Sequence, residues 1–279
     1  MNFVKLIRIM IFWIASYPKS GNTWVRAFLT NYLSNNPRNV FEKINKINRF
    51  PSKDYFKSIV DTEALKKDNI ELFKYFITAQ EKINKNKKIN IIKTHNFAGS
   101  VRGYPFSNSN NTCGSIYIVR DPRSVVVSYA HHANISFEKS VDLLLNENRI
   151  TINEKLYPEA RMSWKIHVLS WLNSSWPKLL IRYEDLHLDT FKYFKNILLF
   201  LNKFVKIEIA DDKIKETIDI CSFKNLLDLE KKFGFQEKRG VVNFFRKGEI
   251  DEWKNTLPLN IVKKIEKNLQ DEMKELDYL

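Results

Sequence analysis

The chain has 279 residues, of which 44% are hydrophobic, so it can bury a sizeable core and does not have the composition of a disordered protein. Its formal net charge of +14 suits polyanionic partners, but lysine is abundant along the whole chain, and we interpret most of this charge as compositional bias. Cys113 and Cys221 are far apart and lack metal-ligand spacing, which argues against a disulfide framework and a zinc site.

The N-terminus, MNFVKLIRIMIFWIA, combines two cations with an apolar run and superficially resembles a signal peptide. The run is short, and no small-residue cleavage site follows it. No stretch of the sequence is long enough to span a membrane as a helix. We therefore expect neither a cleaved leader nor a transmembrane segment.

The most informative stretch is FWIASYPKSGNTWVRAFL, at residues 12–29. Residues 11–15 form an apolar run typical of a buried parallel strand, a turn follows, and a helical pattern begins at Thr23. Backbone N–H groups at a helix N-terminus attract anions, and Lys19 and Ser20 add an ammonium and a hydroxyl group there. This combination predicts a site for a nucleotide phosphate. The alternative is a strand–turn–helix joint with an incidental lysine.

The turn is not a Walker A loop. When the pattern G-x-x-x-x-G-K-[ST] is aligned on Gly21, Ser16 stands at the first glycine and Asn22 at the lysine, while Thr23 matches. The lysine of this chain lies three residues earlier, at Lys19. These differences disfavour a P-loop kinase.

Farther along the chain, apolar patterns alternate between the periods of strands and helices. The predicted strands are residues 89–94, 115–119 and 178–182. The predicted helices are residues 63–83, 123–133, 137–148, 157–173, 189–202, 211–230 and 259–276. Residues 99–114 are predicted to form a loop, and the polar residues 38–90 an insertion over the sheet, where an acceptor pocket can form.

This alternation predicts an α/β fold, with a central, mostly parallel sheet flanked by helices on both faces. The chain has no internal repeat and no low-complexity linker. We therefore expect residues 1–279 to form a single domain.

Two predicted strands end on polar residues. Arg120 directly follows the strand at 115–119, where α/β sheets place their ligands, and Ser128 on the next helix can face the same edge. Arg123 in the same turn is interpreted as a solvated charge. A second buried strand leads to His95, which can accept a proton near neutral pH. No catalytic role is assigned to the other histidines, His131, His132, His167 and His187.

Taken together, these motifs resemble the sulfotransferases that use 3′-phosphoadenosine 5′-phosphosulfate (PAPS). YPKSGNTW at residues 17–24 resembles the family's 5′-phosphosulfate loop, with Asn22 where relatives usually have threonine. Arg120 and Ser128 keep the spacing of its 3′-phosphate motif, and KTH at residues 93–95 resembles its catalytic-histidine strand. The resemblance extends in order over nearly the whole chain.

The last match is RKG at residues 246–248, which resembles the family's segment R-K-G-x-x-G-D-W-K, the segment that closes over the 3′-phosphate. The chain departs from this pattern at Asp251, which replaces a glycine, and at Glu252, which replaces an aspartate. The dimer motif of animal relatives does not continue here, so we do not expect that dimer, and the oligomeric state stays open. The aromatic segment 233–245 before it is interpreted as a lid.

The resemblance implies a P-loop-like, three-layer fold and transfer of a sulfuryl group from PAPS to a hydroxyl group or an amine, with PAPS as co-substrate and no metal ion. His95 would be the general base, Lys19 would stabilise the leaving phosphate, and Lys93 would add a supporting charge. The resemblance also implies which residues bind PAPS. They are Lys19, Ser20, Gly21, Asn22, Thr23, Trp24, Arg120, Ser128, Tyr183, Ser222, Phe223, Arg246, Lys247 and Gly248.

Three of these, Trp24, Tyr183 and Phe223, would flank the adenine, and packing in the core is the alternative for each. The resemblance further implies a cytoplasmic enzyme of the soluble type without a nucleic acid partner. Its acceptor is a small molecule, a lipid or a glycan that the sequence does not identify, and the basic surface favours an anionic or glycan acceptor. Two other hypotheses stay open, namely a kinase that uses ATP and Mg²⁺, and a nucleotide-binding protein without catalysis.

Overall fold

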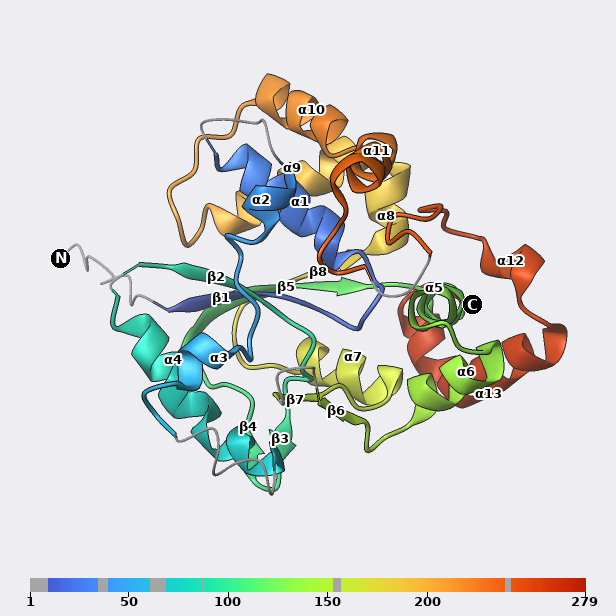
Figure 1. Cartoon of the computed structure of the whole chain (residues 1–279), viewed down its shortest axis with the longest axis horizontal. Coiled ribbons are helices and arrows are strands. Elements are labelled where there is room, and N and C mark those ends of the chain that lie inside the picture. Colours follow the sequence, from blue (N-terminus) through green and yellow to red (C-terminus); the bar gives the residue numbers. More distant parts are fainter. Residues whose placement is uncertain (1–9, 35–39, 61–68, 87, 153–156, 239–241) are drawn as a thin grey trace.

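The computed structural model describes residues 10–34, 40–60, 69–86, 88–152, 157–238 and 242–279. Its central sheet has four parallel strands in the order β2–β1–β5–β8 (Figure 1). Their bounds are β1 Ile11–Ser16, β2 Asn90–Thr94, β5 Thr112–Val119 and β8 Lys178–Arg182. The predicted parallel sheet is confirmed, and β8 has the predicted bounds.

Helices cover both faces of the sheet, which explains the continuous apolar runs of its strands. Side chains alternate along β1, so that Trp13 and Ala15 pack into one core while Phe12 and Ile14 pack into the other. Figure 1 shows α1, α9 and α10 on one side of the sheet and α4 and α7 on the other. These helices are α1 Asn22–Tyr32, α9 Thr190–Leu201, α10 Asp211–Ile220, α4 Phe76–Asn84 and α7 Trp164–Leu172.

Further elements surround these layers. They are the helices α2 Val40–Ile44, α3 Lys53–Phe56, α5 Pro122–Ala133, α6 Phe137–Leu145, α8 Tyr183–Leu188, α11 Phe223–Phe233, α12 Trp253–Thr256 and α13 Leu259–Glu275, and the 3₁₀ helix η2 Asn69–Tyr75. Two antiparallel hairpins pair β3 Ser100–Val101 with β4 Tyr104–Pro105, and β6 Ile150–Ile152 with β7 Pro158–Ala160. Within the described ranges, no helix is both long and apolar enough to cross a membrane.

Two predicted helices were wrong in part because serine caps interrupt them. The helix predicted at 157–173 is only α7, since residues 158–160 pair as β7 and the Ser163 hydroxyl accepts a hydrogen bond from the N–H of Ile166. The helix predicted at 211–230 is divided into α10 and α11, because Ser222 caps α11 in the same way.

Two other predictions were incomplete. The predicted loop at 99–114 contains the β3–β4 hairpin and the first residues of β5. Of the helix predicted at 63–83, residues 63–68 lie outside the described ranges, and the remainder forms η2 and α4.

Arg123, which we interpreted from the sequence as a solvated charge, is buried instead. Its Nη2 lies 2.7 Å from a carboxylate oxygen of Asp121, and its Nη1 lies 2.6 Å from Glu266 on α13. The guanidinium also stacks on the Trp253 ring. Arg123 therefore joins the start of α5 to the C-terminal helix, and the prediction of a solvated charge was wrong.

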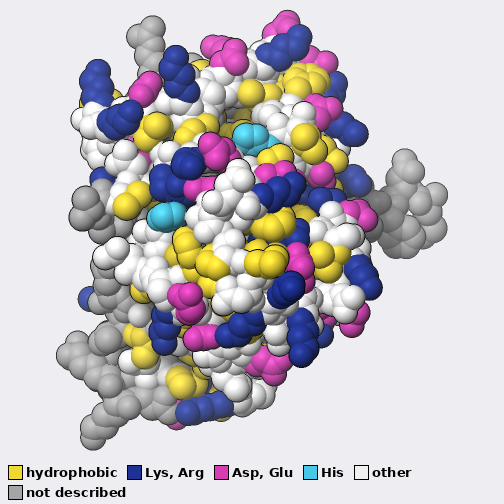
Figure 2. Space-filling view, turned by 90° about the vertical axis from the view of Figure 1, so that its right-hand side faces the viewer, with side chains coloured by type: hydrophobic (Ala, Val, Ile, Leu, Met, Phe, Trp, Pro, Cys, Tyr) yellow, Lys and Arg dark blue, Asp and Glu magenta, His cyan; other side chains and the backbone are white. Residues whose placement is uncertain are grey.

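The surface in Figure 2 mixes charges of both signs. On this face, Lys and Arg side chains lie beside Asp and Glu side chains and hydrophobic groups, without a large region of one sign. The excess positive charge of the chain is therefore not gathered into a continuous patch on this face.

Candidate functional site

A cavity of about 1080 Å³ opens at the carboxyl ends of the parallel strands. Its lining includes residues from the loop after β1, from the ends of β2, β5 and β8, and from the segment after α11. This is the edge at which α/β sheets place their ligands. The sheet order places the β1 loop between His95, after β2, and Arg120, after β5.

The loop after β1 has a backbone that leads directly into α1. Lys19 and Gly21 adopt positive φ angles of 71° and 98°, and Gly21 is the N-cap of α1. A Cβ atom at Gly21 would lie 2.5 Å from the ring of Tyr183, so this position requires glycine for its conformation and for its space. The loop thus directs the N–H groups at the start of α1 toward the cavity edge, as an anion site requires.

Three buried polar atoms of this loop and of Arg120 have no partner among the described residues. They are the hydroxyl oxygen of Ser20, Oδ1 of Asn22 and Nε of Arg120. A buried polar atom without a hydrogen bond costs about 1–3 kcal/mol, so such atoms in a cavity indicate a ligand-binding surface. Asn22, at the position usually held by threonine, donates from its amide to the carbonyl of Ile14 and fixes the loop to β1.

Lys19 and Arg120 bring two cations together. Arg120 donates to the Lys19 carbonyl at 3.2 Å and to the Glu249 carbonyl at 2.8 Å, and its guanidinium lies 4.3 Å from the centre of the Tyr183 ring. The Lys19 ammonium lies 3.9 Å from the centre of the Phe244 ring. Burial and the neighbouring Arg120 charge lower the pKa of Lys19 to about 7. A bound anion would relieve this repulsion.

The three residues predicted to flank the adenine, which we call the predicted adenine wall, come from three parts of the chain. Trp24, Tyr183 and Phe223 all line the cavity, and the Trp24 indole donates to the Cys221 carbonyl at 3.0 Å. The Trp24 ring lies edge-on to Tyr183, with 6.2 Å between ring centres. Ser222 does not line the cavity, because its hydroxyl caps α11.

The segment at residues 246–248 also reaches the cavity, together with Ser128 on α5. Arg246 pairs closely with Glu252, and the Lys247 ammonium lies 3.4 Å from the same carboxylate. Gly248 has a φ of 72°, and a Cβ atom there would lie 2.5 Å from the Phe223 ring. These contacts connect the segment to the predicted adenine wall.

His95 lies just beyond β2 with one defined tautomer. Its Nδ1 is 2.8 Å from the backbone carbonyl of Ser16, and because a carbonyl only accepts, Nδ1 carries the proton and Nε2 has the lone pair. Burial and the nearby Lys93 ammonium hold the pKa of His95 well below its usual value, so the ring is neutral at pH 7. His167 donates from Nε2 to the His95 carbonyl at 3.3 Å and accepts at Nδ1 from Tyr117 at 2.8 Å.

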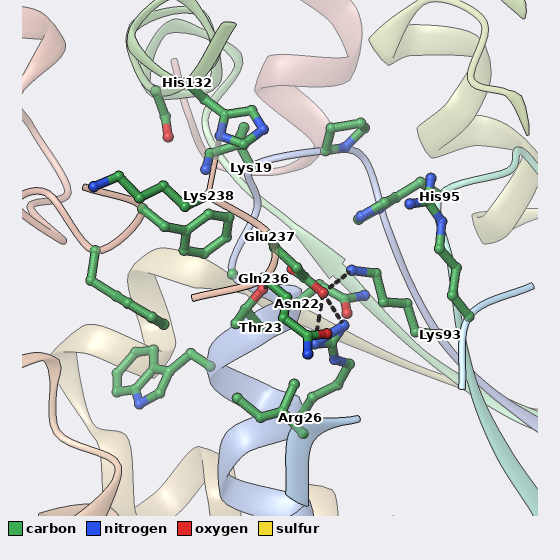
Figure 3. Close-up of a pocket in the computed structure, with 18 of the residues that line it drawn as sticks. Lys19, Asn22, Thr23, Arg26, Lys93, His95, His132, Gln236, Glu237 and Lys238 are labelled. Atoms are coloured by element: carbon green, nitrogen blue, oxygen red, sulfur yellow. Dashed lines mark hydrogen bonds and ion pairs between the residues drawn. The ribbon is translucent and has the colours of Figure 1, made fainter. Parts of the chain in front are cut away.

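The predictions did not include Glu237, from the segment interpreted as a lid. Its carboxylate accepts hydrogen bonds from Thr23 at 3.1 Å, from Arg26 at 2.8 and 2.9 Å, and from Lys93 at 2.8 Å (Figure 3). Burial and the Arg26 charge lower the pKa of Lys93 to about 8. Glu237 thus joins the predicted phosphate loop to the strand of His95.

Besides Arg26, two further arginines of the cavity were absent from the predictions. Arg49 and Arg161 both pair with Glu159, which is completely buried. Neither Glu237 nor this arginine pair belongs to a recognisable motif, because each comes from a segment whose place depends on the tertiary fold. The only signal for Arg49 was its location in the polar insertion at 38–90, where we expected an acceptor pocket.

Comparison with known proteins identifies the family. The sulfotransferase domain family matches residues 11–277. Flavonol 3-sulfotransferase of Flaveria bidentis is 27% identical over 271 residues, which cover 93% of this chain and 80% of the relative. Cytosolic sulfotransferase 6 of Arabidopsis thaliana is 25% identical over 276 residues, which cover 93% of this chain and 77% of the relative.

A solved structure agrees with this fold. The crystal structure of a mouse sulfotransferase complexed with PAP (3′-phosphoadenosine 5′-phosphate) matches this fold with a TM-score of 0.60 and 19% sequence identity. The match covers 96% of this chain and 85% of that chain. Because the family match spans nearly all of the described sheet and cavity, the chain belongs to the sulfotransferase domain family.

Proposed function

We propose that this protein transfers a sulfuryl group from PAPS to a hydroxyl group or an amine of an acceptor, without a metal ion. The observation that carries the proposal is a cluster of donors beside a neutral histidine. Lys19, Gly21, Asn22 and Thr23, at the start of α1, line the same cavity as His95, and the Ser20 hydroxyl between them is buried without a partner among the described residues. Binding of PAP by a relative that shares the fold supports the choice of nucleotide.

The residues around the cavity fit a nucleotide with two phosphate groups. The turn at residues 19–23 would hold the 5′-phosphosulfate through backbone N–H groups and the hydroxyls of Ser20 and Thr23. Arg120, with Ser128, would hold the 3′-phosphate. The segment 246–248 would close over the same group, and the adenine wall defined above would enclose the base. We assign Ser222 to capping α11 rather than to direct contact.

PAPS supplies the sulfuryl group, and the residues of this chain position the acceptor and move its proton. We propose that Nε2 of His95 takes the proton of the acceptor hydroxyl as the acceptor oxygen bonds to sulfur and the bond from sulfur to the phosphate oxygen breaks. General base catalysis of this kind contributes about 10²–10⁴ in rate. Lys19 would stabilise the negative charge that develops on the phosphate, and the Lys93 ammonium would add a supporting positive charge.

The organisation of the protein follows the same proposal. We propose one sulfotransferase domain over residues 1–279 and a cytoplasmic location, which similarity to a cytosolic sulfotransferase of Arabidopsis thaliana supports. We propose no nucleic acid partner.

The decisive experiment is calorimetric titration with 3′-phosphoadenosine 5′-phosphate (PAP), compared with ATP and Mg²⁺. We expect PAP to bind preferentially. Arg120→Ala should weaken PAP about 10- to 150-fold, since a hydrogen bond to a charged group contributes about 1.5–3 kcal/mol. Lys195→Ala is the matched control, because Lys195 pairs with Asp211 outside the cavity. Preference for ATP would favour a kinase instead, and binding of neither nucleotide would overturn the proposal.

A further inference from the structure

The cavity extends beyond His95 to a region that the nucleotide residues do not reach. Residues 48–50 pair alongside β2, where the Lys93 N–H donates to the Asn48 carbonyl and the Phe50 N–H donates to the Lys93 carbonyl. β2 is an edge strand of the four-stranded sheet, on the opposite side of β1 from β5 and β8, which lead to Arg120 and Tyr183. Residues 48–49, 51–54 and 57 therefore line the side of the cavity where an acceptor would meet His95.

We call this region the acceptor wall. It consists of the cavity residues Arg49, Lys53, Asp54, Lys57, Tyr157 and Arg161. Four of them are cationic and one is acidic. Even when the carboxylates of Glu159 and Glu237 are counted with the wall, positive charge remains in excess. An acceptor site for a neutral aromatic molecule would present mainly apolar groups.

A buried carboxylate holds two arginines of this wall in place. Arg49 binds Glu159 through Nε at 3.0 Å and through Nη2 at 2.5 Å, while Arg161 donates to the same carboxylate at 2.8 Å. Glu159 is 0% exposed, whereas the Arg49 and Arg161 side chains are 33% and 12% exposed. One carboxylate cannot neutralise two guanidinium groups, so this cluster keeps a net positive charge.

One donor of the cluster is not used by the described part of the protein. Nε of Arg161 is buried and has no hydrogen-bond partner among the described residues. The cluster is also close to the catalytic position, since Arg49 and Arg161 both lower the pKa of His95 while Glu159 raises it. A neutral acceptor would strip water from these guanidinium groups without replacing its hydrogen bonds, whereas an oxyanion would replace them.

On the basis of the proposed function, we propose that the acceptor carries an oxyanion in addition to its reacting group, and that Arg49 and Arg161 bind this oxyanion. The oxyanion is a carboxylate, a sulfate or a phosphate. Guanidinium groups bind all three with paired hydrogen bonds. Arg49 and Arg161 are specificity-determining residues in this proposal, while His95 receives the proton from the reacting hydroxyl.

Matched acceptor pairs test the proposal. The pairs are 4-hydroxybenzoate with 4-hydroxybenzamide, 4-hydroxybenzenesulfonate with its sulfonamide, and glucose 6-phosphate with glucose. Release of PAP from PAPS gives kcat/KM for each compound. We expect the anionic member of at least one pair to exceed its neutral partner by about tenfold or more, as a charge-assisted contact predicts. The pair with the largest ratio identifies the oxyanion.

Variants separate recognition from a structural role of the two arginines. In Arg49→Gln and Arg161→Gln, the ratio of kcat/KM for the anionic member to kcat/KM for its neutral partner should fall by about tenfold, mainly through a higher KM for the anionic member. Arg49→Lys retains a charge without the paired geometry and should lose part of the preference, which provides a second test if the glutamine variants fold poorly. Lys195→Gln, outside the cavity, is the control.

Three outcomes would overturn the proposal. These are equal or better turnover of the neutral members, an equal loss for both members in the arginine variants, and no turnover of any anionic compound by protein that binds PAP. The last outcome would leave the donor assignment intact. Failure to bind PAP would instead contradict the proposed function itself, so the two failures are distinguishable.

Discussion

At the scale of single residues, His95 has the properties of a general base. The Ser16 carbonyl fixes the proton on Nδ1, and burial keeps the ring neutral. We expect His95→Asn to lower the rate of sulfuryl transfer by about 10²–10⁴, since a general base contributes this factor. The affinity for PAP should stay unchanged in calorimetry. His131→Asn, which replaces a histidine outside the cavity lining, is the control, and retained transfer in His95→Asn would remove His95 from the mechanism.

Lys19 gives a prediction about pH. Its pKa is lowered to about 7, so at pH 8 the side chain is mostly neutral in the free protein. A phosphate beside it favours the ammonium form and raises the pKa, so PAP binding at pH 8 should take up about one proton, and at pH 6 much less. Titration in buffers of different ionisation enthalpy measures this uptake.

The Lys19→Arg variant isolates the group responsible, because arginine stays protonated and cannot take up the proton. Lys93 has a pKa of about 8 and is the other candidate for proton uptake. Undiminished uptake by Lys19→Arg would therefore assign the proton to Lys93 and contradict the role given to Lys19.

At the scale of elements, the segment after α11 places a carboxylate where a donor phosphate is expected. The Glu237 carboxylate accepts a hydrogen bond from the Thr23 hydroxyl and pairs with the cations of Arg26 and Lys93. Two negative groups at one site repel each other, so Glu237→Gln should tighten PAP binding by about tenfold in calorimetry. An unchanged or weaker affinity would show that Glu237 helps to organise the site. Glu216→Gln on the exposed side of α10 controls for the loss of one negative charge.

The accuracy of the sequence predictions also varied by element. Strands of the central sheet were predicted well, because burial on both faces gives uninterrupted apolar runs, as at residues 11–15, which are all buried. The hairpin that includes residues 158–160 was missed, since its short strands depend on pairing with residues 150–152. Propensity alone did not show that Ser163 and Ser222 would act as caps inside predicted helices.

In the candidate site, too, some residues could be predicted from local sequence patterns and others could not. The turn at residues 19–23 and the Arg120–Ser128 spacing are local patterns, and the sequence was sufficient to locate them beside one cavity. Glu237 and the Arg49–Arg161 pair depend on contacts between distant segments. No local pattern predicts such contacts, because they arise only when the insertion and the segment after α11 fold over the sheet.

At the scale of the whole molecule, the C-terminal helix is fastened to the edge of the sheet that carries the predicted nucleotide-binding residues. Arg123 at the start of α5 donates to the Tyr278 carbonyl at 2.7 Å and to Glu266 on α13. The Tyr278 hydroxyl donates to Glu184 at 3.0 Å, and Glu184 accepts the N–H of Asp121 at 3.0 Å. The end of the chain thereby supports residues 120–123 and the start of α8.

Arg123→Met tests this support. Removing one partner of a buried ion pair leaves Asp121 charged and unpaired, so we expect the free energy of unfolding in urea to fall by about 3–5 kcal/mol. Lys264→Met is the matched control, because Lys264 pairs with Asp142 at the surface and such pairs contribute less than about 1 kcal/mol. If both variants lose equally little, α13 is held by apolar packing alone, since Ile265, Leu269 and Met273 would then suffice to dock it.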